Sequence, residues 1–270
     1  MLRECIFPTA YGPIRYWTNN QGKDDLWLVM LPGLTADHHL FDEQIKEFIG
    51  KVNLFTWDPP AHGQSKPWDG SQNLYQNACY LHDILEKEGI TQYVLIGQSM
   101  GGYLSQMYLD TYPGEAKGFI SVDSACLKSS YYTEAELALL KNTYWMYRSI
   151  PWKLLIEWGS AGNAATPHGQ AYMKNLMASY DQKEFCHLAD KGYKALCEAV
   201  RANKAYFIDC PLLVLCGEKD AAGSTRHYNK QWQAREGVNL VWVPNAGHLS
   251  NLDNPEFVNA QIKKFIQSLN

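Results

Sequence analysis

Short apolar runs alternate with amphipathic stretches along most of this chain. The apolar runs are rich in β-branched and aromatic residues and predict buried strands; they span 26–31, 52–57, 92–96, 118–123, 211–216 and 238–243. The amphipathic stretches predict helices; they span 39–49, 72–88, 103–109, 224–235 and 255–269. Residues 4–19 predict a hairpin. Because alternating strands and helices form parallel βαβ units, we predict an α/β fold whose mostly parallel central sheet of about eight strands is flanked by helices.

The alternation stops at residues 125–205, which hold several helical patterns and no convincing strand. A helical insertion commonly folds over the carboxyl edge of the sheet, where open α/β sheets bind their ligands. We therefore predict a core domain of residues 1–124 and 206–270, with a helical cap of residues 125–205 inserted after the sixth strand. The helical patterns of the cap span 134–147, 151–158, 170–179 and 181–202.

The charge and cysteine content narrow the functional classes. A net charge of −4 over 270 residues leaves no basic footprint, which argues against nucleic acid as a partner. The seven cysteines are odd in number and scattered, and no C-x-x-C pair occurs, so neither a disulfide framework nor a zinc site is indicated. We expect reduced thiols and a cytoplasmic protein.

The first residues combine no basic segment with an apolar core, so they do not predict a signal peptide. The longest apolar run, Leu26 to Leu31, is far shorter than the roughly 20 residues of a membrane span. We therefore expect no membrane span. The oligomeric state is left open.

The segment Gly97-Gln98-Ser99-Met100-Gly101 joins the predicted strand 92–96 to the predicted helix 103–109. This is the strand-turn-helix setting of the G-x-S-x-G nucleophile elbow, in which a strained serine is lifted above the sheet. Glycines are required two residues to either side because a Cβ there would collide with neighbouring elements. Ser99 is thus the candidate nucleophile. The alternative is an ordinary turn that needs only glycine.

A serine hydroxyl needs a positioned base, and the base needs a carboxylate to hold it. His248 follows the last predicted strand and is the leading candidate for the base. Asp220 follows the strand 211–216 in the sequence Gly217-Glu218-Lys219-Asp220 and is the leading acid. Asp123, at the end of another strand, remains a competing candidate.

An oxyanion formed on the substrate needs two backbone N–H donors. The residue after the nucleophile, Met100, should supply one donor. Leu34, in the loop Pro32-Gly33-Leu34 that follows the strand 26–31, should supply the other. An ordinary Pro-Gly turn is the alternative interpretation of that loop.

Taken together, five segments in this order resemble the α/β-hydrolase fold superfamily over nearly all of the chain except the cap. They are Leu31-Pro32-Gly33-Leu34, the loop 58–65, the elbow, Gly217-Glu218-Lys219-Asp220, and Gly247-His248 followed by Asn254-Pro255-Glu256-Phe257. The family usually has His-Gly where this chain has Pro32-Gly33. The resemblance implies acyl transfer through a covalent intermediate on Ser99, with no metal or organic cofactor. We therefore expect a serine hydrolase that cleaves a small to medium ester, like a carboxylesterase or lipase.

Other interpretations share the same residues. The same fold hosts lyases, C–C bond hydrolases and acyltransferases, and a receptor with slow turnover is a further alternative. A short-peptide peptidase would need an amine-recognising carboxylate in the cap, where the candidates are Glu134, Glu136, Glu157 and Glu184. Aromatic residues of the cap predict either an apolar acyl or aryl pocket or simply the core of the cap; they are Tyr144, Trp145, Tyr147, Trp152 and Trp158.

Overall fold

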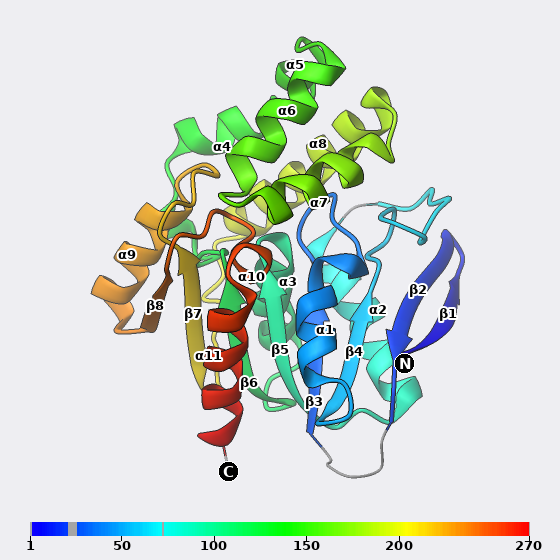
Figure 1. Cartoon of the computed structure of the whole chain (residues 1–270), viewed down its shortest axis with the longest axis vertical. Coiled ribbons are helices and arrows are strands. Elements are labelled where there is room, and N and C mark those ends of the chain that lie inside the picture. Colours follow the sequence, from blue (N-terminus) through cyan, green and yellow to red (C-terminus); the bar gives the residue numbers. More distant parts are fainter. Residues whose placement is uncertain (1, 21–25, 72, 270) are drawn as a thin grey trace.

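A computed structural model describes residues 2–20, 26–71 and 73–269. Eight strands form one sheet in the order β1-β2-β4-β3-β5-β6-β7-β8 (Figure 1). The pairs β1–β2 and β2–β4 are antiparallel and all other pairs are parallel, which confirms the mostly parallel sheet with a hairpin at one edge. The strands are β1 (Arg3–Thr9), β2 (Gly12–Thr18), β3 (Leu26–Leu31), β4 (Asn53–Trp57), β5 (Gln92–Gln98), β6 (Ala116–Val122), β7 (Leu212–Gly217) and β8 (Asn239–Val243).

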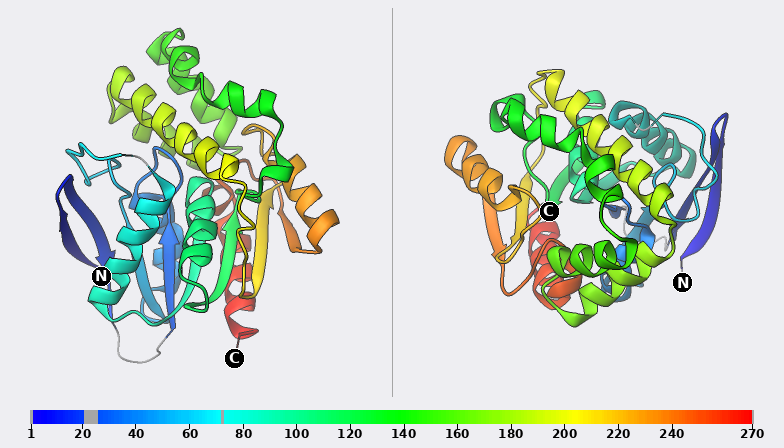
Figure 2. Two further views of the ribbon diagram at one scale, coloured as in Figure 1. Left: turned by 180° about the vertical axis from the view of Figure 1, so that it is seen from behind. Right: turned by 90° about the horizontal axis from the view of Figure 1, so that it is seen from above.

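Helices cover both faces of the sheet, so the parallel strands are buried on both sides (Figures 1 and 2). Helices α1 and α11 pack on one face, and α2, α3 and α9 pack on the other. Strand β7 shows the alternation: Leu213 and Leu215 join the cluster that contains Ile262 of α11, while Val214 and Cys216 join Trp232 of α9. These helices are α1 (Asp42–Phe48), α2 (Leu74–Glu88), α3 (Met100–Thr111), α9 (Thr225–Glu236) and α11 (Pro255–Gln267).

Element boundaries differ slightly from the predicted ones. The helix predicted over 39–49 is a short 3-10 turn, η1 (His38–Phe41), followed by α1. Residue 72, where a helix was predicted to begin, lies outside the described residues, and α2 begins at Leu74 after the cap residue Asn73. Among the helices of the described ranges, none is both long and apolar enough to cross a membrane.

Five α-helices lie between β6 and β7, and in Figures 1 and 2 they stand over the carboxyl ends of the parallel strands. They are α4 (Glu134–Leu140), α5 (Thr143–Arg148), α6 (Trp152–Asn163), α7 (Pro167–Ala178) and α8 (Gln182–Arg201). The single helix predicted over 134–147 is divided into α4 and α5. At the break, Asn142 Nδ2 donates to the Ala138 carbonyl and Thr143 Oγ1 to the Leu140 carbonyl. Such side-chain bonds compete with the helical ladder.

Helix α8 runs along the underside of this insertion and faces the core. Its buried residues recur at helical spacing from Phe185 to Val200. Gly192 allows close approach, because a Cβ there would overlap the side chain of Leu34 in the loop after β3. The inserted helices therefore pack directly on the loop that carries one predicted oxyanion donor.

A pair of glycines tests how tightly the elbow is packed. A Cβ on Gly101, in the first turn of α3, would overlap the Leu31 carbonyl oxygen, whereas a Cβ on Gly162 in α6 would meet nothing within 4 Å. We expect Gly101→Ala to lower the free energy of unfolding by about 3 kcal/mol or more. Gly162→Ala should be neutral or stabilising by up to about 1 kcal/mol, because alanine is the better helix former. Urea denaturation measures both, and equal effects would contradict the packing argument.

Candidate active site

The turn between β5 and α3 holds Ser99 in a strained conformation. Its φ and ψ are 49° and −114°, in a region that side chains other than glycine seldom adopt. The glycines on either side permit this turn, because a Cβ on Gly97 would overlap Gly101 and one on Gly102 would lie 2.6 Å from the Ser124 hydroxyl oxygen. Ser99 directly follows β5, a central strand whose carboxyl end lies beneath the inserted helices (Figure 1).

Ser99, His248 and Asp220 form one hydrogen-bonded row. The distance from Ser99 Oγ to His248 Nε2 is 2.9 Å, and that from His248 Nδ1 to Asp220 Oδ2 is also 2.9 Å. A carboxylate can only accept, so Nδ1 carries the ring proton and leaves Nε2 free to accept the serine proton. The structure thus brings together the three residues predicted from strand ends far apart in the sequence.

The surroundings of His248 prepare it to gain a proton. Burial lowers the pKa of the imidazole, but the charge and hydrogen bond of Asp220, together with the charge of Asp123, outweigh burial and raise the pKa above its ordinary value. Asp220 is only 5% exposed, so water screens this interaction little. The pair therefore stabilises the imidazolium that would form when the serine loses its proton.

Asp123, the competing acid, has other partners. Its Oδ1 accepts the N–H of Gly217 at 2.8 Å and its Oδ2 accepts the N–H of Ser250 at 2.8 Å. It thereby ties the end of β7, just before Asp220, to the loop just after His248. Its backbone is strained, with a φ of 48°. Burial and then the charge of Asp220 raise the pKa of Asp123 to about 7. The geometry favours Asp220 as the partner of His248 and gives Asp123 a bracing position.

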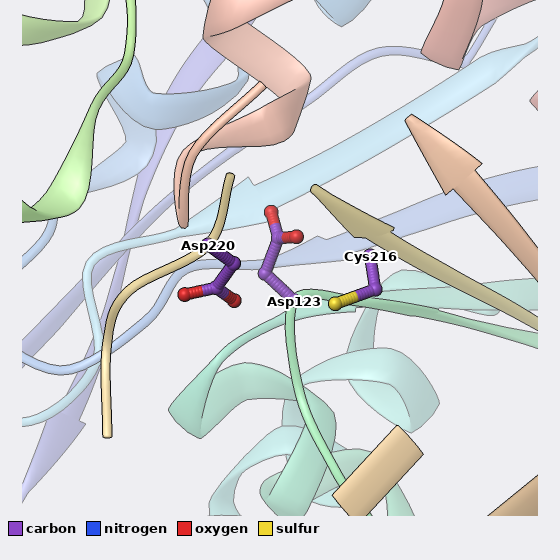
Figure 3. A group of neighbouring side chains, drawn as sticks. All are labelled: Asp123, Cys216 and Asp220. Atoms are coloured by element: carbon purple, nitrogen blue, oxygen red, sulfur yellow. The ribbon is translucent and has the colours of Figure 1, made fainter. Parts of the chain in front are cut away.

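Figure 3 shows Asp123 and Asp220 gathered with Cys216 where β6 and β7 end. One ligand atom from each of the three lies within 4.8 Å of the others, which is a spacing that could hold a metal ion. The carboxylate oxygens, however, already accept hydrogen bonds from Gly217, Ser250, Ala222 and His248. Burial raises the pKa of the Cys216 thiol, so it offers no thiolate. This donor set suits hydrogen bonding better than metal binding.

The two predicted oxyanion donors lie near the serine. Leu34 and Met100 line the same cavity as Ser99 and His248. The Met100 amide is the first of helix α3, ahead of the intrahelical ladder, and such amides favour developing negative charge. In the opposite loop, a Cβ on Gly33 would lie 3.1 Å from the Cβ of Ser99, so glycine allows the loop to approach the serine closely.

Two supporting residues carried no recognised signal in the sequence. Gln98, inside the elbow, donates from Nε2 to the His248 carbonyl at 2.8 Å. Asp253 accepts the N–H of Gly247 at 2.7 Å and the N–H of Ala165 at 2.7 Å. Both carboxylate oxygens of Asp253 are used, because Oδ1 accepts the Thr166 N–H at 2.9 Å. Asp253 thus joins the histidine loop to the connection between α6 and α7.

A cavity of about 390 Å³ opens above Ser99 between the sheet edge and the inserted helices. Its walls are mainly apolar and aromatic, and six tyrosines contribute to them. These are Tyr103, Tyr132, Tyr147, Tyr172, Tyr193 and Tyr228.

Of the five aromatic residues considered for such a pocket, only Tyr147 is among the described residues that line the cavity. Trp152 packs against Phe185 with ring centroids 5.4 Å apart, and Tyr144 lies against His187. Trp145 and Trp158 are 73% and 60% exposed. Four of these five aromatic residues therefore serve the packing and surface of the insertion, and the aromatic wall of the cavity is built mainly from other tyrosines.

Comparison with known proteins agrees with this fold. A family model described as alpha/beta hydrolase fold matches residues 27–255. The chain is 26% identical over 262 residues to 2-succinyl-6-hydroxy-2,4-cyclohexadiene-1-carboxylate synthase of Serratia proteamaculans, covering 91% of this chain and 95% of that one. It is 27% identical over 252 residues to 3-oxoadipate enol-lactonase 1 of Acinetobacter baylyi, covering 89% and 85% of the two chains.

Solved structures show the same architecture. A thermophilic esterase from Thermogutta terrifontis superimposes with a TM-score of 0.78 at 18% identity, covering 100% of this chain and 99% of that chain. A hydrolase from Pseudomonas aeruginosa superimposes with a TM-score of 0.79 at 17% identity, covering 97% of this chain and 98% of that chain. At these identities the likeness concerns the fold.

Proposed function

The chain belongs to the α/β-hydrolase fold family, and on that premise we propose that it cleaves a small to medium carboxylic ester through an acyl-enzyme on Ser99. The main support for this proposal is the hydrogen-bonded chain of Ser99, His248 and Asp220. The distances from Ser99 Oγ to His248 Nε2 and from His248 Nδ1 to Asp220 Oδ2 are both 2.9 Å. Nucleophilic catalysis needs a serine, a base within hydrogen-bond reach and a group that orients the base.

Acylation follows from the hydrogen bonds. Ser99 Oγ attacks the ester carbonyl carbon while its proton moves to His248 Nε2, and the carbonyl electron pair becomes an oxyanion. The amides of Leu34 and Met100 donate to this oxyanion. The C–O bond to the alcohol then breaks, and the alcohol leaves with the proton held on Nε2. Asp220 keeps the ring oriented and stabilises its charged form.

Deacylation repeats the sequence with water. His248 Nε2 takes a proton from water as the water oxygen attacks the acyl carbon, and a second oxyanion forms. The bond between the acyl carbon and Ser99 Oγ then breaks, and Oγ takes the proton from Nε2. The carboxylic acid is released and the enzyme is restored. The chain's own residues move every proton in this scheme.

Residues 125–205 form the cap in this proposal, and 1–124 with 206–270 form the core that bears the catalytic groups. The cap supplies the upper wall of the cavity through residues of all five helices from α4 to α8. It would exclude water and size the substrate. All seven cysteines are free thiols, which favours the reducing cytoplasm as the compartment.

The relatives support ester chemistry in general terms. One is named a lactonase, whose substrate is a cyclic ester, and another is named a putative carbamate hydrolase from Escherichia coli. A third is named a synthase. Because these substrates differ at similar identity, the choice of an ester depends on the row of hydrogen bonds and the apolar cavity of this chain.

Turnover of p-nitrophenyl esters from acetate to octanoate tests the proposal. We expect steady hydrolysis with an optimum at a medium chain length, because a cavity of about 390 Å³ holds a medium acyl group. A fluorophosphonate should inactivate the enzyme and add its mass to the peptide that contains Ser99. Labelling at another residue, or full activity after labelling of Ser99, would contradict the proposal.

A further inference from the structure

We propose that the cavity above Ser99 selects uncharged substrates and rejects those that carry a carboxylate; this inference rests on the proposed function and names its substrate class. Ser99 lies on the floor of this cavity. Among the described residues that line it, none is Lys or Arg. An anionic group that enters an apolar site loses its hydration, and without a cationic partner few interactions compensate that loss of free energy.

The hydroxyl groups of the cavity do not replace a cation, because most of their protons already have acceptors. Tyr132 donates to the Cys126 carbonyl at 2.8 Å, and its oxygen lies 3.2 Å from that of Tyr103. The hydroxyl of Tyr172 donates to Asp37 Oδ1 at 3.4 Å.

The hydroxyl groups of Tyr147 and Tyr193 interact with each other, so that pair offers the substrate at most a neutral donor. One neutral donor suits a carbonyl or ether oxygen of the substrate. It does not compensate a desolvated carboxylate, which accepts several hydrogen bonds.

Glu136 adds a repulsive charge to this wall. It is the acidic residue among the described lining residues, and it lies in the first turn of α4. Burial raises its pKa, but hydrogen bonds from Tyr228, Thr133 and Ser224 more than offset burial and hold the pKa below its ordinary value. Glu136 is therefore ionised at neutral pH and repels a substrate carboxylate.

The same hydrogen bonds make Glu136 a poor site for a substrate cation. Oε2 accepts both the N–H and the hydroxyl of Thr133 at 2.8 Å, and Oε1 is approached by Ser224 Oγ at 3.4 Å. The hydroxyl of Tyr228 also interacts with this carboxylate. An ammonium group would have to displace one of these donors, so the structure favours neither sign of charge.

Three rigid esters of p-nitrophenol test this selectivity: those of 4-methylbenzoic, 4-carboxybenzoic and 4-(aminomethyl)benzoic acid. They share one shape and differ in the charge at the far end of the acyl group. We expect kcat/KM for the carboxylate to be at least about 100-fold below that for the methyl compound. The ammonium compound should not exceed the methyl compound. A carboxylate ester cleaved within tenfold of the neutral one, or a preferred ammonium ester, would overturn the inference.

Matched variants assign the effect to Glu136. Glutamine also completes a capping box, so Glu136→Gln should fold and should reduce the penalty on the carboxylate ester at least about fivefold. Glu134→Gln is the control, because Glu134 lies on the same helix and pairs with Arg201 at the surface. This control variant should leave the ratio of kcat/KM for the methyl ester to that for the carboxylate ester unchanged. A penalty that the two variants change equally would contradict the role of Glu136.

Binding to Ser99→Ala separates this inference from the proposed reaction. Saturation-transfer NMR compares methyl 4-methylbenzoate with monomethyl terephthalate, which differ by the same carboxylate. We expect only the neutral compound to give transfer at millimolar concentration. Neutral binding without ester turnover by the wild type would refute the esterase proposal and keep the cavity's selectivity. Equal transfer to both compounds would refute the selectivity whatever the reaction.

Discussion

Replacing Ser99 with alanine is expected to lower kcat for the best p-nitrophenyl ester by about a thousandfold or more. The variant loses the only atom that forms the acyl-enzyme, so the residual rate reflects the oxyanion donors and substrate binding alone. The free energy of unfolding should not fall, because alanine keeps the Cβ of Ser99 and, among the described residues, the hydroxyl hydrogen-bonds to His248 alone. Steady-state kinetics and thermal melts measure the two effects.

Ser130→Ala is the control for this variant. Ser130 is exposed and its backbone carbonyl, which the substitution keeps, accepts a hydrogen bond from Arg235. Its kinetics should equal those of the wild type. If Ser99→Ala kept a tenth or more of wild-type kcat, Ser99 would not be the nucleophile and the serine hydrolase proposal would fail.

Asparagine at Asp220 should cost about 10⁴-fold in kcat, whereas asparagine at Asp123 should cost less than about tenfold. An amide at residue 220 offers His248 Nδ1 no certain acceptor and permits the wrong tautomer of the ring. An amide at residue 123 keeps one acceptor for Gly217 or Ser250 and does not face the imidazole nitrogens. The reverse order of effects would assign the acid to Asp123.

The pH dependence of stability gives Asp123→Asn a second readout. The pKa of Asp123 is raised to about 7 in the fold, so its ionisation opposes folding as pH rises from its ordinary acidic range to about 7. Asparagine does not ionise. The wild type should therefore lose stability relative to Asp123→Asn between pH 5 and pH 8, which urea denaturation at both values would show. A constant difference would contradict the raised pKa.

Features with a local chemical requirement were predictable from the sequence. The nucleophile elbow was predictable because a strained serine at a strand-to-helix turn requires glycine at residues 97 and 101. The central sheet was predictable because strands such as β3 and β5 carry apolar side chains on both faces. Asp220 and Asp123 both follow the ends of strands, and their hydrogen bonds distinguish them in the structure. Asp220 bonds His248 Nδ1, whereas Asp123 accepts the backbone N–H groups of Gly217 and Ser250.

Other features depend on contacts between distant segments and leave no local pattern. Gln98 occupies a variable position of the G-x-S-x-G motif, and its side chain donates to the carbonyl of His248, which lies 150 residues further along the chain. Glu136 follows the rule for a capping box, and nothing in that rule reveals that its other face lines a cavity. The break between α4 and α5 depends on Asn142 and Thr143 side chains that would equally fit a continuous helix.

The bonds of Asp253 limit how this enzyme can acquire new substrates. Asp253 holds Gly247 with one oxygen and the α6–α7 connection with both, and the Leu249 amide donates to the Asn163 carbonyl at 3.0 Å. A chimaera that imports another helical insertion would bring a foreign connection against the loop that carries His248 and would displace this side chain from Ser99. Grafting foreign sequence into α4 and α5 is safer, because within the described ranges these helices do not bond to the loop that carries His248. Changes intended to alter substrate choice should therefore begin in α4 and α5 and leave residues 163–166 unchanged.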